Sequence, residues 1–411
     1  MKVLLLLLLV WQNSQAYADF PRSTPEAVGL SSETLEELSH HLSTLVDAGK
    51  IPYSSLLVSR YGLVAHLDHH GEIGDSNKLP LNPHTLMRIY SMTKPIVATA
   101  LMMLWEEGKF QLDDPIGLYL PNLRGLMVYS GHYEGQPIIL PPRSQPTIRQ
   151  ILSHTGGFTY GIFGNSWVDQ QYQLHIKSER GDSLTGVIES LGQIPLLTEP
   201  GQRWVYSISS DIQGRLIEVL SGMELEAFLR QRLFTPLGMD ATGFTVRPWD
   251  DILLADIFRY TEEKGLQKVK APLGPFVEKA TFKSGGGGLV STLYDYWQFA
   301  EMIRQKGYAN GQMLLKQSTI DLIFKNHALA ITGHPPFSNA SGPITNVGYG
   351  LGVAAKNIGP TTWYYWPGIA NTHFLVDPKT GISVVFMTQV LNDNLKPVQN
   401  LLETMVYKAI L

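Results

Sequence analysis

The segment Ser91-Met92-Thr93-Lys94-Pro95 opens an apolar run that continues to Gly108. We predict a helix over 92–107, and because it is apolar nearly all round, a central one. At a helix start, a spacing of three residues puts Ser91 and Lys94 on the same face, with Cβ atoms about 5–6 Å apart. Exclusion of water and the positive end of a helix dipole both disfavour a charged lysine, and a neutral amine can accept a serine proton. The first-turn N–H groups point towards an oxyanion formed there. Alone the pair is weak, because a chain of this size holds about one Ser-x-x-Lys by chance.

Further segments accompany this pair along the chain. They are Leu112-Asp113-Asp114-Pro115, Tyr119-Leu120-Pro121, Ile151-Leu152-Ser153-His154-Thr155-Gly156-Gly157, Glu199-Pro200-Gly201, Tyr206-Ser207, Ser284-Gly285-Gly286-Gly287-Gly288-Leu289-Val290-Ser291-Thr292 and Trp366-Pro367-Gly368. In this order they resemble the serine β-lactamase and penicillin-binding-protein superfamily, most closely its class C β-lactamase-like esterase branch, the family VIII carboxylesterases. The resemblance implies an α/β (α+β), β-lactamase/transpeptidase-like fold, in which an antiparallel sheet is flanked by helices and carries an inserted, mainly helical domain.

Tyr206 matches the tyrosine of the family's Tyr-x-Asn motif, which hydrogen-bonds the nucleophile and shuttles its proton. The resemblance therefore implies Ser91 as the nucleophile, with Lys94 and Tyr206 as the acid and base. Without the resemblance, a buried structural tyrosine beside Trp204 would be the favoured interpretation. The third motif position is Ile208, and an apolar residue there weakens the contact that the family's asparagine makes with a β-lactam side chain.

Trp366-Pro367-Gly368 lies where β-lactamases carry Lys-Thr-Gly on the strand that edges the site. The missing lysine removes an anchor for a substrate carboxylate, whereas a tryptophan offers an apolar wall. The resemblance implies that the N–H groups of Ser91 and Ile369 form the oxyanion hole. Pro367 leaves this hole intact, because a proline lacks only its own N–H.

The resemblance also implies a set of substrate contacts, namely Trp366, Gly368, Ile208 and His373. His154 falls in the matched segment 151–157, and His373 lies five residues after the end of the segment Trp366-Pro367-Gly368. Each is more often a structural hydrogen-bonding group than a catalyst, so we expect both to support the site from behind.

Two polar clusters invite other interpretations. Ser284 and the four glycines after it could cradle phosphate, but no Walker lysine accompanies them, so a close-packed turn lining the cleft is favoured. His66, Asp68 and His70 alternate on one face of an expected strand. Their order is not that of metallo-β-lactamases, so we expect an exposed hairpin end and no metal site.

The composition excludes several functional classes. The 411-residue chain has 32 Lys and Arg, 36 Asp and Glu, a formal net charge of −4 and no Cys. Thiol nucleophiles, iron–sulfur clusters, Cys-ligated zinc and disulfides are therefore excluded. The negative charge argues against a surface that follows nucleic-acid phosphates. We expect no cofactor and no nucleic acid, and a small-molecule ester as the partner, while the sequence leaves the oligomeric state open.

Hydrophobic periodicity predicts the sheet from both ends of the chain. We expect a helix over 31–48, a hairpin of 54–60 and 63–67, strands over 347–355, 361–366, 372–376 and 382–390, and a closing helix after 397. The middle carries helical patches at 147–153, 211–221 and 225–233. We therefore predict a sheet domain of 19–110 plus 281–411 and a mainly helical inserted domain of 111–280, with the site in the cleft between them.

The first residues have the pattern of an export signal. Lys2 precedes an apolar run over 3–11, and Ala16-Tyr17-Ala18 has the small-x-small shape of a cleavage site. The run is far short of the about 20 residues that span a bilayer. We expect 1–18 to be a cleaved signal peptide and the chain to be secreted or periplasmic, without stable membrane insertion. An uncleaved anchor or a buried N-terminal strand are the alternatives.

These features favour a secreted serine hydrolase that cleaves carboxylic esters through a Ser91 acyl-enzyme. A second hypothesis keeps the site but changes the chemistry, to a β-lactamase or DD-peptidase acting on β-lactams or peptidoglycan, or to an acyltransferase. Ile208 and the missing lysine count against β-lactams. A third hypothesis, a non-catalytic ligand-binding protein, is disfavoured because Ser91, Lys94 and Tyr206 are all present.

Overall fold

The computed structural model describes residues 20–74, 78–176, 183–246, 253–272, 282–339, 341–392 and 396–411. The expected signal peptide, residues 1–18, lies outside the described residues. Within them, no helix has both the length and the apolar character that crossing a membrane requires.

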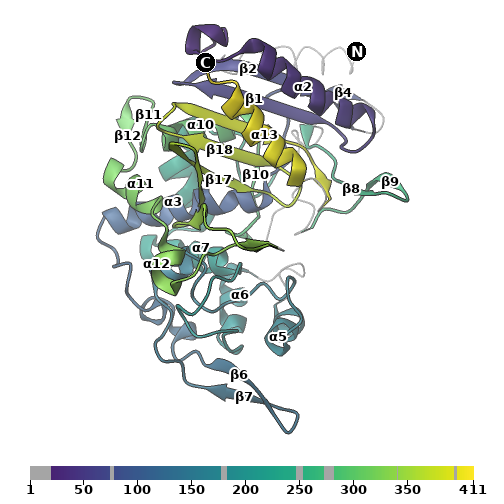
Figure 1. Ribbon diagram of the computed structural model, residues 1–411. Coiled ribbons are helices and arrows are strands. Elements are labelled where there is room, and N and C mark those ends of the chain that lie inside the picture. Colours follow the sequence, from purple (N-terminus) through teal and green to yellow (C-terminus); the bar gives the residue numbers. More distant parts are fainter. Residues whose placement is uncertain are drawn as a thin grey trace, which may run out of the picture.

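A seven-stranded antiparallel sheet joins the two ends of the chain, in the order β15-β16-β17-β18-β19-β1-β2 (Figure 1). Its strands are β1 (Ser54–Arg60), β2 (Leu63–His70), β15 (Val347–Tyr349), β16 (Ala354–Ile358), β17 (Thr361–Pro367), β18 (His373–Asp377) and β19 (Ile382–Met387). The early strand β1 pairs with the late strand β19, Leu57 lying opposite Val385. The sheet therefore brings together strands from the early and the late parts of the chain.

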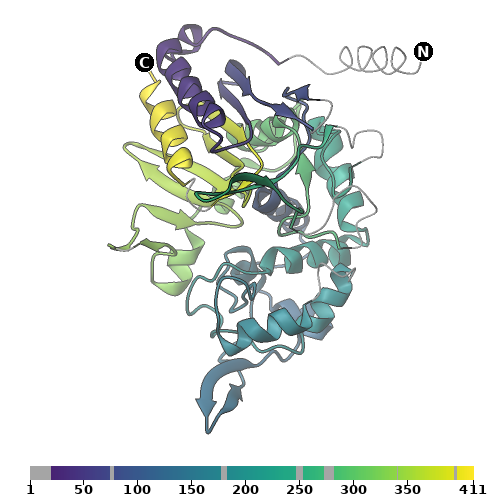
Figure 2. The same cartoon turned by 90° about the vertical axis from the view of Figure 1, so that its right-hand side faces the viewer.

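Helices cover both faces of this sheet (Figures 1 and 2). On one face lie α2 (Ser32–Asp47) and α13 (Lys396–Lys408), and on the other α3 (Thr93–Glu106) and α10 (Leu293–Arg304). Successive side chains of a strand point to opposite faces of the sheet. Leu375 of β18 packs in the α2–α13 core, whereas its neighbours Phe374 and Val376 pack in the core on the α3 and α10 side. Since α3 is buried along nearly its whole length, it is the central helix that its composition predicted.

A mainly helical region lies beyond α3, at the bottom of Figures 1 and 2. It contains α4 (Ile148–Leu152), α5 (Trp167–His175), α6 (Leu184–Leu191), α7 (Ser209–Ser221), α8 (Leu225–Leu229) and α9 (Thr235–Leu237), with the hairpin of β6 (Val128–Tyr133) and β7 (Gln136–Leu140). Helix α7 packs directly against α3. This contact joins the helical region to the sheet region at the helix that carries Lys94.

Short elements complete the described fold. A small sheet is formed by β8 (Phe258–Thr261), β9 (Gly265–Lys268) and β20 (Val390–Leu391). The remaining pairs are β3 (Glu72–Ile73) with β4 (Leu79–Pro80), β5 (Met87–Arg88) with β10 (Val290–Ser291), β11 (Tyr308–Ala309) with β12 (Gln312–Met313) and β13 (Ser338–Asn339) with β14 (Gly342–Pro343). Two further helices, α11 (Gln317–Ile323) and α12 (His327–Thr332), precede β15.

Three predicted elements differ in the structure. The strand expected over 347–355 is two strands, because the chain turns against α3 at Gly352, where φ is +84° and an added Cβ would lie 2.3 Å from Ala98. The strand expected over 382–390 ends at Met387, and β20 then pairs in parallel with β8. The helix expected over 225–233 loosens into a π-helical turn at Arg230.

The His66, Asp68 and His70 group is half-buried, and the prediction of an exposed hairpin end was wrong. The reason is that α2 packs over β2, so that Ser39 of α2 hydrogen-bonds the His66 Nε2 at 2.7 Å. Asp68 and His70 pair with each other at 2.8 Å. Each of these side chains therefore has a structural partner.

Candidate active site

Ser91, Lys94 and Tyr206 meet at the start of α3. Ser91 lies in a 3₁₀ turn, Tyr90–Met92, that leads into the helix. Lys94 is 1% exposed, and its Nζ donates hydrogen bonds to Ser91 Oγ at 3.2 Å and to the carbonyl of Gly286 at 2.6 Å. The Tyr206 hydroxyl donates to the same Ser91 oxygen at 2.6 Å. The serine oxygen thus lies between the two groups that the sequence predicted as its proton acceptors.

The backbone before Ser91 holds a conformation that is rare for a residue with a side chain. Tyr90 has a φ of +42°, in the left-handed region. Such a residue costs on the order of 1–3 kcal/mol and persists only where its surroundings fix it. The Tyr90 side chain is 2% exposed, and the adjacent Ile89 N–H donates to the Leu289 carbonyl at 3.1 Å. The strain is therefore stored directly beside the candidate nucleophile.

A buried carboxyl behind Lys94 organises the glycine-rich turn. Asp211 is 2% exposed on the first turn of α7, and its Oδ1 accepts hydrogen bonds from the Ser284 hydroxyl at 2.7 Å and the Gly286 N–H at 3.2 Å. Burial raises the pKa of Asp211 above its usual value, and the nearby Lys94 opposes part of this effect. Asp211 therefore helps to position Gly286, whose carbonyl accepts a hydrogen bond from Lys94.

The sequence did not single out three residues beside Lys94. They are Asp211, Tyr160 and Gly286, whose carbonyl accepts a hydrogen bond from Lys94. The Tyr160 ring centroid lies 5.2 Å from Lys94 Nζ, and burial raises the pKa of the Tyr160 phenol well above its usual value. The one available signal was the spacing of Asp211 five residues after Tyr206. An acidic residue in a first helical turn has an ordinary explanation in the helix dipole, so this signal is weak.

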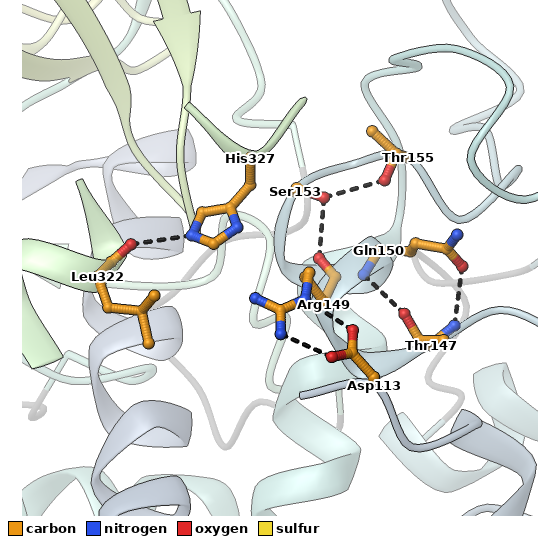
Figure 3. Close-up of polar contacts among 8 residues, drawn as sticks. All are labelled: Asp113, Thr147, Arg149, Gln150, Ser153, Thr155, Leu322 and His327. Carbon is orange, nitrogen blue, oxygen red and sulfur yellow. Dashed lines mark hydrogen bonds and ion pairs between the residues drawn. The ribbon is translucent and has the colours of Figure 1, made fainter. Parts of the chain in front are cut away.

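Polar side-chain contacts hold helix α4 at both of its ends (Figure 3). Thr147 and Gln150 form a reciprocal capping box at its start, and Arg149 makes two hydrogen bonds to Asp113, at 2.7 and 2.8 Å. At its end, the Ser153 hydroxyl donates to the Arg149 carbonyl at 2.8 Å. Through Arg149, these hydrogen bonds connect two of the matched sequence segments, 112–115 and 151–157.

His154 connects the end of α4 to Tyr206. Its φ is +56°, and its carbonyl accepts the N–H of Val205 at 2.9 Å. Its Nδ1 pairs with the Ser207 hydroxyl at 3.0 Å, and its ring lies 5.1 Å from the Tyr206 ring. Burial, and then the charge of Lys94, hold the pKa of His154 well below its usual value, so the ring is neutral. His154 therefore supports Tyr206 from behind, the position that its sequence segment suggested.

Ser91 and Ile369, the residues that carry the candidate oxyanion donors, line the same cavity. Gly368 packs so tightly that an added Cβ would lie 2.6 Å from the Ile89 carbonyl, which brings the end of β17 against the Ser91 turn. The Gly368 N–H donates to the Thr372 carbonyl at 2.8 Å and closes the turn. Among the described residues, the N–H groups of Ser91 and Ile369 have no hydrogen-bond acceptor. Both remain available to a substrate oxygen.

A cavity of about 980 Å³ opens above Ser91. Of the four predicted substrate contacts, Trp366, Gly368 and Ile208 line it, as do Ser284 and Asp211. The described lining side chains are apolar, aromatic or neutral polar, apart from the carboxyl of Asp211. The turn at Ser284 lines the cleft, as predicted.

His373 does not line this cavity, so its prediction as a substrate contact was wrong. It is fully buried on the opposite face of the sheet, where its Nε2 lies 3.9 Å from Glu403 of α13. Strand alternation explains this, since His373 shares a face with Leu375, which packs in the α2–α13 core. Burial lowers the pKa of His373 to about 3.

A family model described as Beta-lactamase matches residues 38–402, which is most of the chain. The chain belongs to the beta-lactamase family. Protein Rv1367c of Mycobacterium tuberculosis is 28% identical to this family member over 324 residues, covering 76% of the chain and 79% of the relative. The lovastatin esterase of Penicillium rubens is 26% identical over 370 residues, and the match covers 84% of this chain and 90% of the relative.

Solved structures confirm the beta-lactamase fold of this family member. EstCE1, described as a hydrolase with promiscuous acyltransferase activity, superposes with a TM-score of 0.75 at 24% identity, covering 91% of this chain and 99% of its own. The family match and the esterase relative together identify the chain as an enzyme of the serine hydrolase group with a β-lactamase-like fold.

Proposed function

We propose that this family member is an exported carboxylic ester hydrolase that works through an acyl-enzyme on Ser91. The observation that carries the proposal is the double contact at Ser91 Oγ, with Lys94 Nζ at 3.2 Å and the Tyr206 hydroxyl at 2.6 Å. A serine hydroxyl is a weak nucleophile unless a neighbouring base removes its proton. Two groups that can exchange protons with it, one of them shielded from water, supply this condition.

The proposed reaction runs in two halves. Lys94 and Tyr206 together accept the one proton that Ser91 loses while its oxygen attacks the ester carbonyl. The N–H groups of Ser91 and Ile369 stabilise the tetrahedral oxyanion. As the intermediate collapses, the C–O bond to the alcohol breaks and the same two groups return the proton to the leaving oxygen. Water then attacks the acyl-enzyme by the reverse relay and releases the acid and free Ser91.

The charge of the cavity supports an ester over a β-lactam or a peptidoglycan stem. Those alternative substrates carry a carboxylate, which a buried site accepts only with a cation or several hydrogen-bond donors. The lining side chain at the family's lysine position is Trp366, and none of the described lining side chains is a lysine or arginine that would anchor a carboxylate. A neutral ester fits this environment without an unpaired charge.

Substitution of the nucleophile tests the proposal directly. The Ser91→Ala variant should lose hydrolysis of a short-chain p-nitrophenyl ester while it unfolds at the wild-type temperature, and Ser43→Ala on α2 should retain both. Turnover of nitrocefin by the wild type, at the same enzyme concentration, should be far below its ester turnover. Residual full activity of Ser91→Ala would overturn the mechanism, and nitrocefin turnover above ester turnover would favour the β-lactamase alternative.

Acyl transfer to a second alcohol would use the same acyl-enzyme. Added acceptor alcohol distinguishes the two outcomes, because an acyltransferase forms a new ester without a matching rise in free acid. For a hydrolase, we expect free acid to account for the acyl groups released.

Export through residues 1–18 is the remaining part of the proposal. The pattern of Lys2, the apolar run and Ala16-Tyr17-Ala18 supports it. N-terminal sequencing of the protein recovered outside the cytoplasm should begin after Ala18. A recovered chain that still carries Met1 would contradict cleavage.

A further inference from the structure

Three large apolar side chains stand exposed at one side of the active-site cavity. Ile162 is 66% exposed, and Phe163 and Leu174 are each 62% exposed, yet all three line the cavity. We name Ile162, Phe163 and Leu174 the apolar rim. An exposed apolar cluster that borders a binding cavity marks a surface that is covered when a ligand binds.

The segment that carries the apolar rim is held in place before any ligand arrives. Asp169 of α5 accepts hydrogen bonds from the Thr159 hydroxyl and the Ser166 hydroxyl, each at 2.7 Å. The Gln173 side-chain amide donates to the Gly161 carbonyl at 2.5 Å. Gly161 has a φ of +74°, and an added Cβ would lie 2.5 Å from the Tyr172 Cβ. The loop is thus fixed to α5, and the exposure of its apolar side chains is built into the fold.

The position of Phe163 relative to Tyr206 indicates which half of an ester meets the apolar rim. The Phe163 ring lies 5.8 Å from the Tyr206 ring, whose hydroxyl reaches Ser91 Oγ. The leaving oxygen of an ester must come within hydrogen-bond distance of the group that protonates it, which is the Tyr206 hydroxyl in the proposed mechanism. In the same mechanism, the carbonyl oxygen accepts hydrogen bonds from the N–H groups of Ser91 and Ile369. The alcohol half therefore extends on the Tyr206 side, towards Phe163.

We propose that the apolar rim binds the alcohol half of the substrate, and that the enzyme selects esters of large apolar alcohols. This inference rests on the proposed function, because it uses Tyr206 as the proton donor to the leaving group. Burial of an alkyl group against Phe163 and Leu174 removes apolar surface of both partners from water, which stabilises the transition state as long as the alcohol remains bound.

Two ester series separate the two halves of the substrate. In the first, the acid is acetic acid and the alcohol lengthens from ethanol to butanol to octanol; in the second, the alcohol is ethanol and the acid lengthens from acetate to butyrate to octanoate. For the wild type, kcat/KM should rise along the alcohol series. In Phe163→Ala and in Leu174→Ala, the ratio of kcat/KM for octyl acetate over ethyl acetate should fall about tenfold or more, in line with the discrimination that apolar pockets achieve.

Tyr133→Ala provides a matched control, because Tyr133 is 68% exposed on the β6–β7 hairpin and does not line the cavity. It should leave the octyl-to-ethyl ratio unchanged. A wild type without preference for octyl acetate would overturn the inference, as would rim variants that alter the acyl series in place of the alcohol series. The proposed function fails by a different result, namely ester hydrolysis by Ser91→Ala, so the two failures are distinguishable.

Discussion

Replacement of Tyr206 by phenylalanine removes one oxygen atom from the site and little else. The hydroxyl donates to Ser91 Oγ at 2.6 Å, whereas the ring packs against the rings of His154 at 5.1 Å and Trp366 at 5.5 Å. A lost general acid–base group costs about 10²–10⁴-fold in rate. One lost hydrogen bond costs folding only about 1 kcal/mol. We therefore expect kcat to fall at least about a hundredfold while the melting temperature shifts by about 3 °C or less.

A comparison of two leaving groups tests the role of Tyr206 as a proton donor. An alkoxide needs a proton as it departs, whereas p-nitrophenolate leaves without one. The loss in Tyr206→Phe should therefore be larger for ethyl acetate than for p-nitrophenyl acetate, measured as initial rates at saturating substrate. Tyr349→Phe is the matched control, since its buried ring touches His154 and Trp366 and its hydroxyl has no hydrogen-bond partner among the described residues. A Tyr206→Phe variant with wild-type kcat on ethyl acetate would refute the assigned role.

Other perturbations follow from the same contacts. Gly286→Ala should lower kcat about tenfold or more, because an added Cβ would lie 2.5 Å from the Tyr160 oxygen and displace the carbonyl that holds Lys94; unchanged kinetics would contradict this. His373 has a pKa of about 3 when folded and 6.5 when unfolded, so the unfolded chain binds an extra proton below pH 6.5 and stability falls as the pH drops towards 3. His373→Leu should reduce that slope by up to about 1.4 kcal/mol per pH unit, as followed by urea unfolding, and an unaltered slope would exclude His373 as its source. Arg149→Met should cost under about 1 kcal/mol of stability, because Asp113 is largely exposed; a large loss would show that the pair does more than brace α4.

The parts of the fold that sequence could predict are those with strong local patterns. The amphipathic helix over 31–48 and the hairpin from Ser54 correspond to α2, β1 and β2 within a few residues. The seven matched segments predicted the β-lactamase-like fold, and the family match confirms it. Motif order also brought Ser91, Lys94 and Tyr206 together as candidates, although they lie far apart along the chain.

What sequence could not predict depends on contacts between distant segments. The break in the strand after Tyr349 arises where Gly352 packs on Ala98 of α3, and no local pattern encodes that approach. The position of His373 depends on which sheet face α13 covers, and a motif match cannot decide that. Asp211 becomes part of the site only because α7 packs on α3 beside the glycine-rich turn. Each of these outcomes was set by tertiary packing.

The central claim is that Ser91 carries the acyl group, and a trapped intermediate tests it most directly. The enzyme is mixed with excess p-nitrophenyl acetate, quenched in acid within the first turnovers and digested, and the peptides are analysed by mass spectrometry. We predict one added acetyl group on the peptide containing Ser91, and no such adduct in Ser91→Ala. An acetyl group on a different residue in the active wild type, with Ser91 unmodified, would contradict the account.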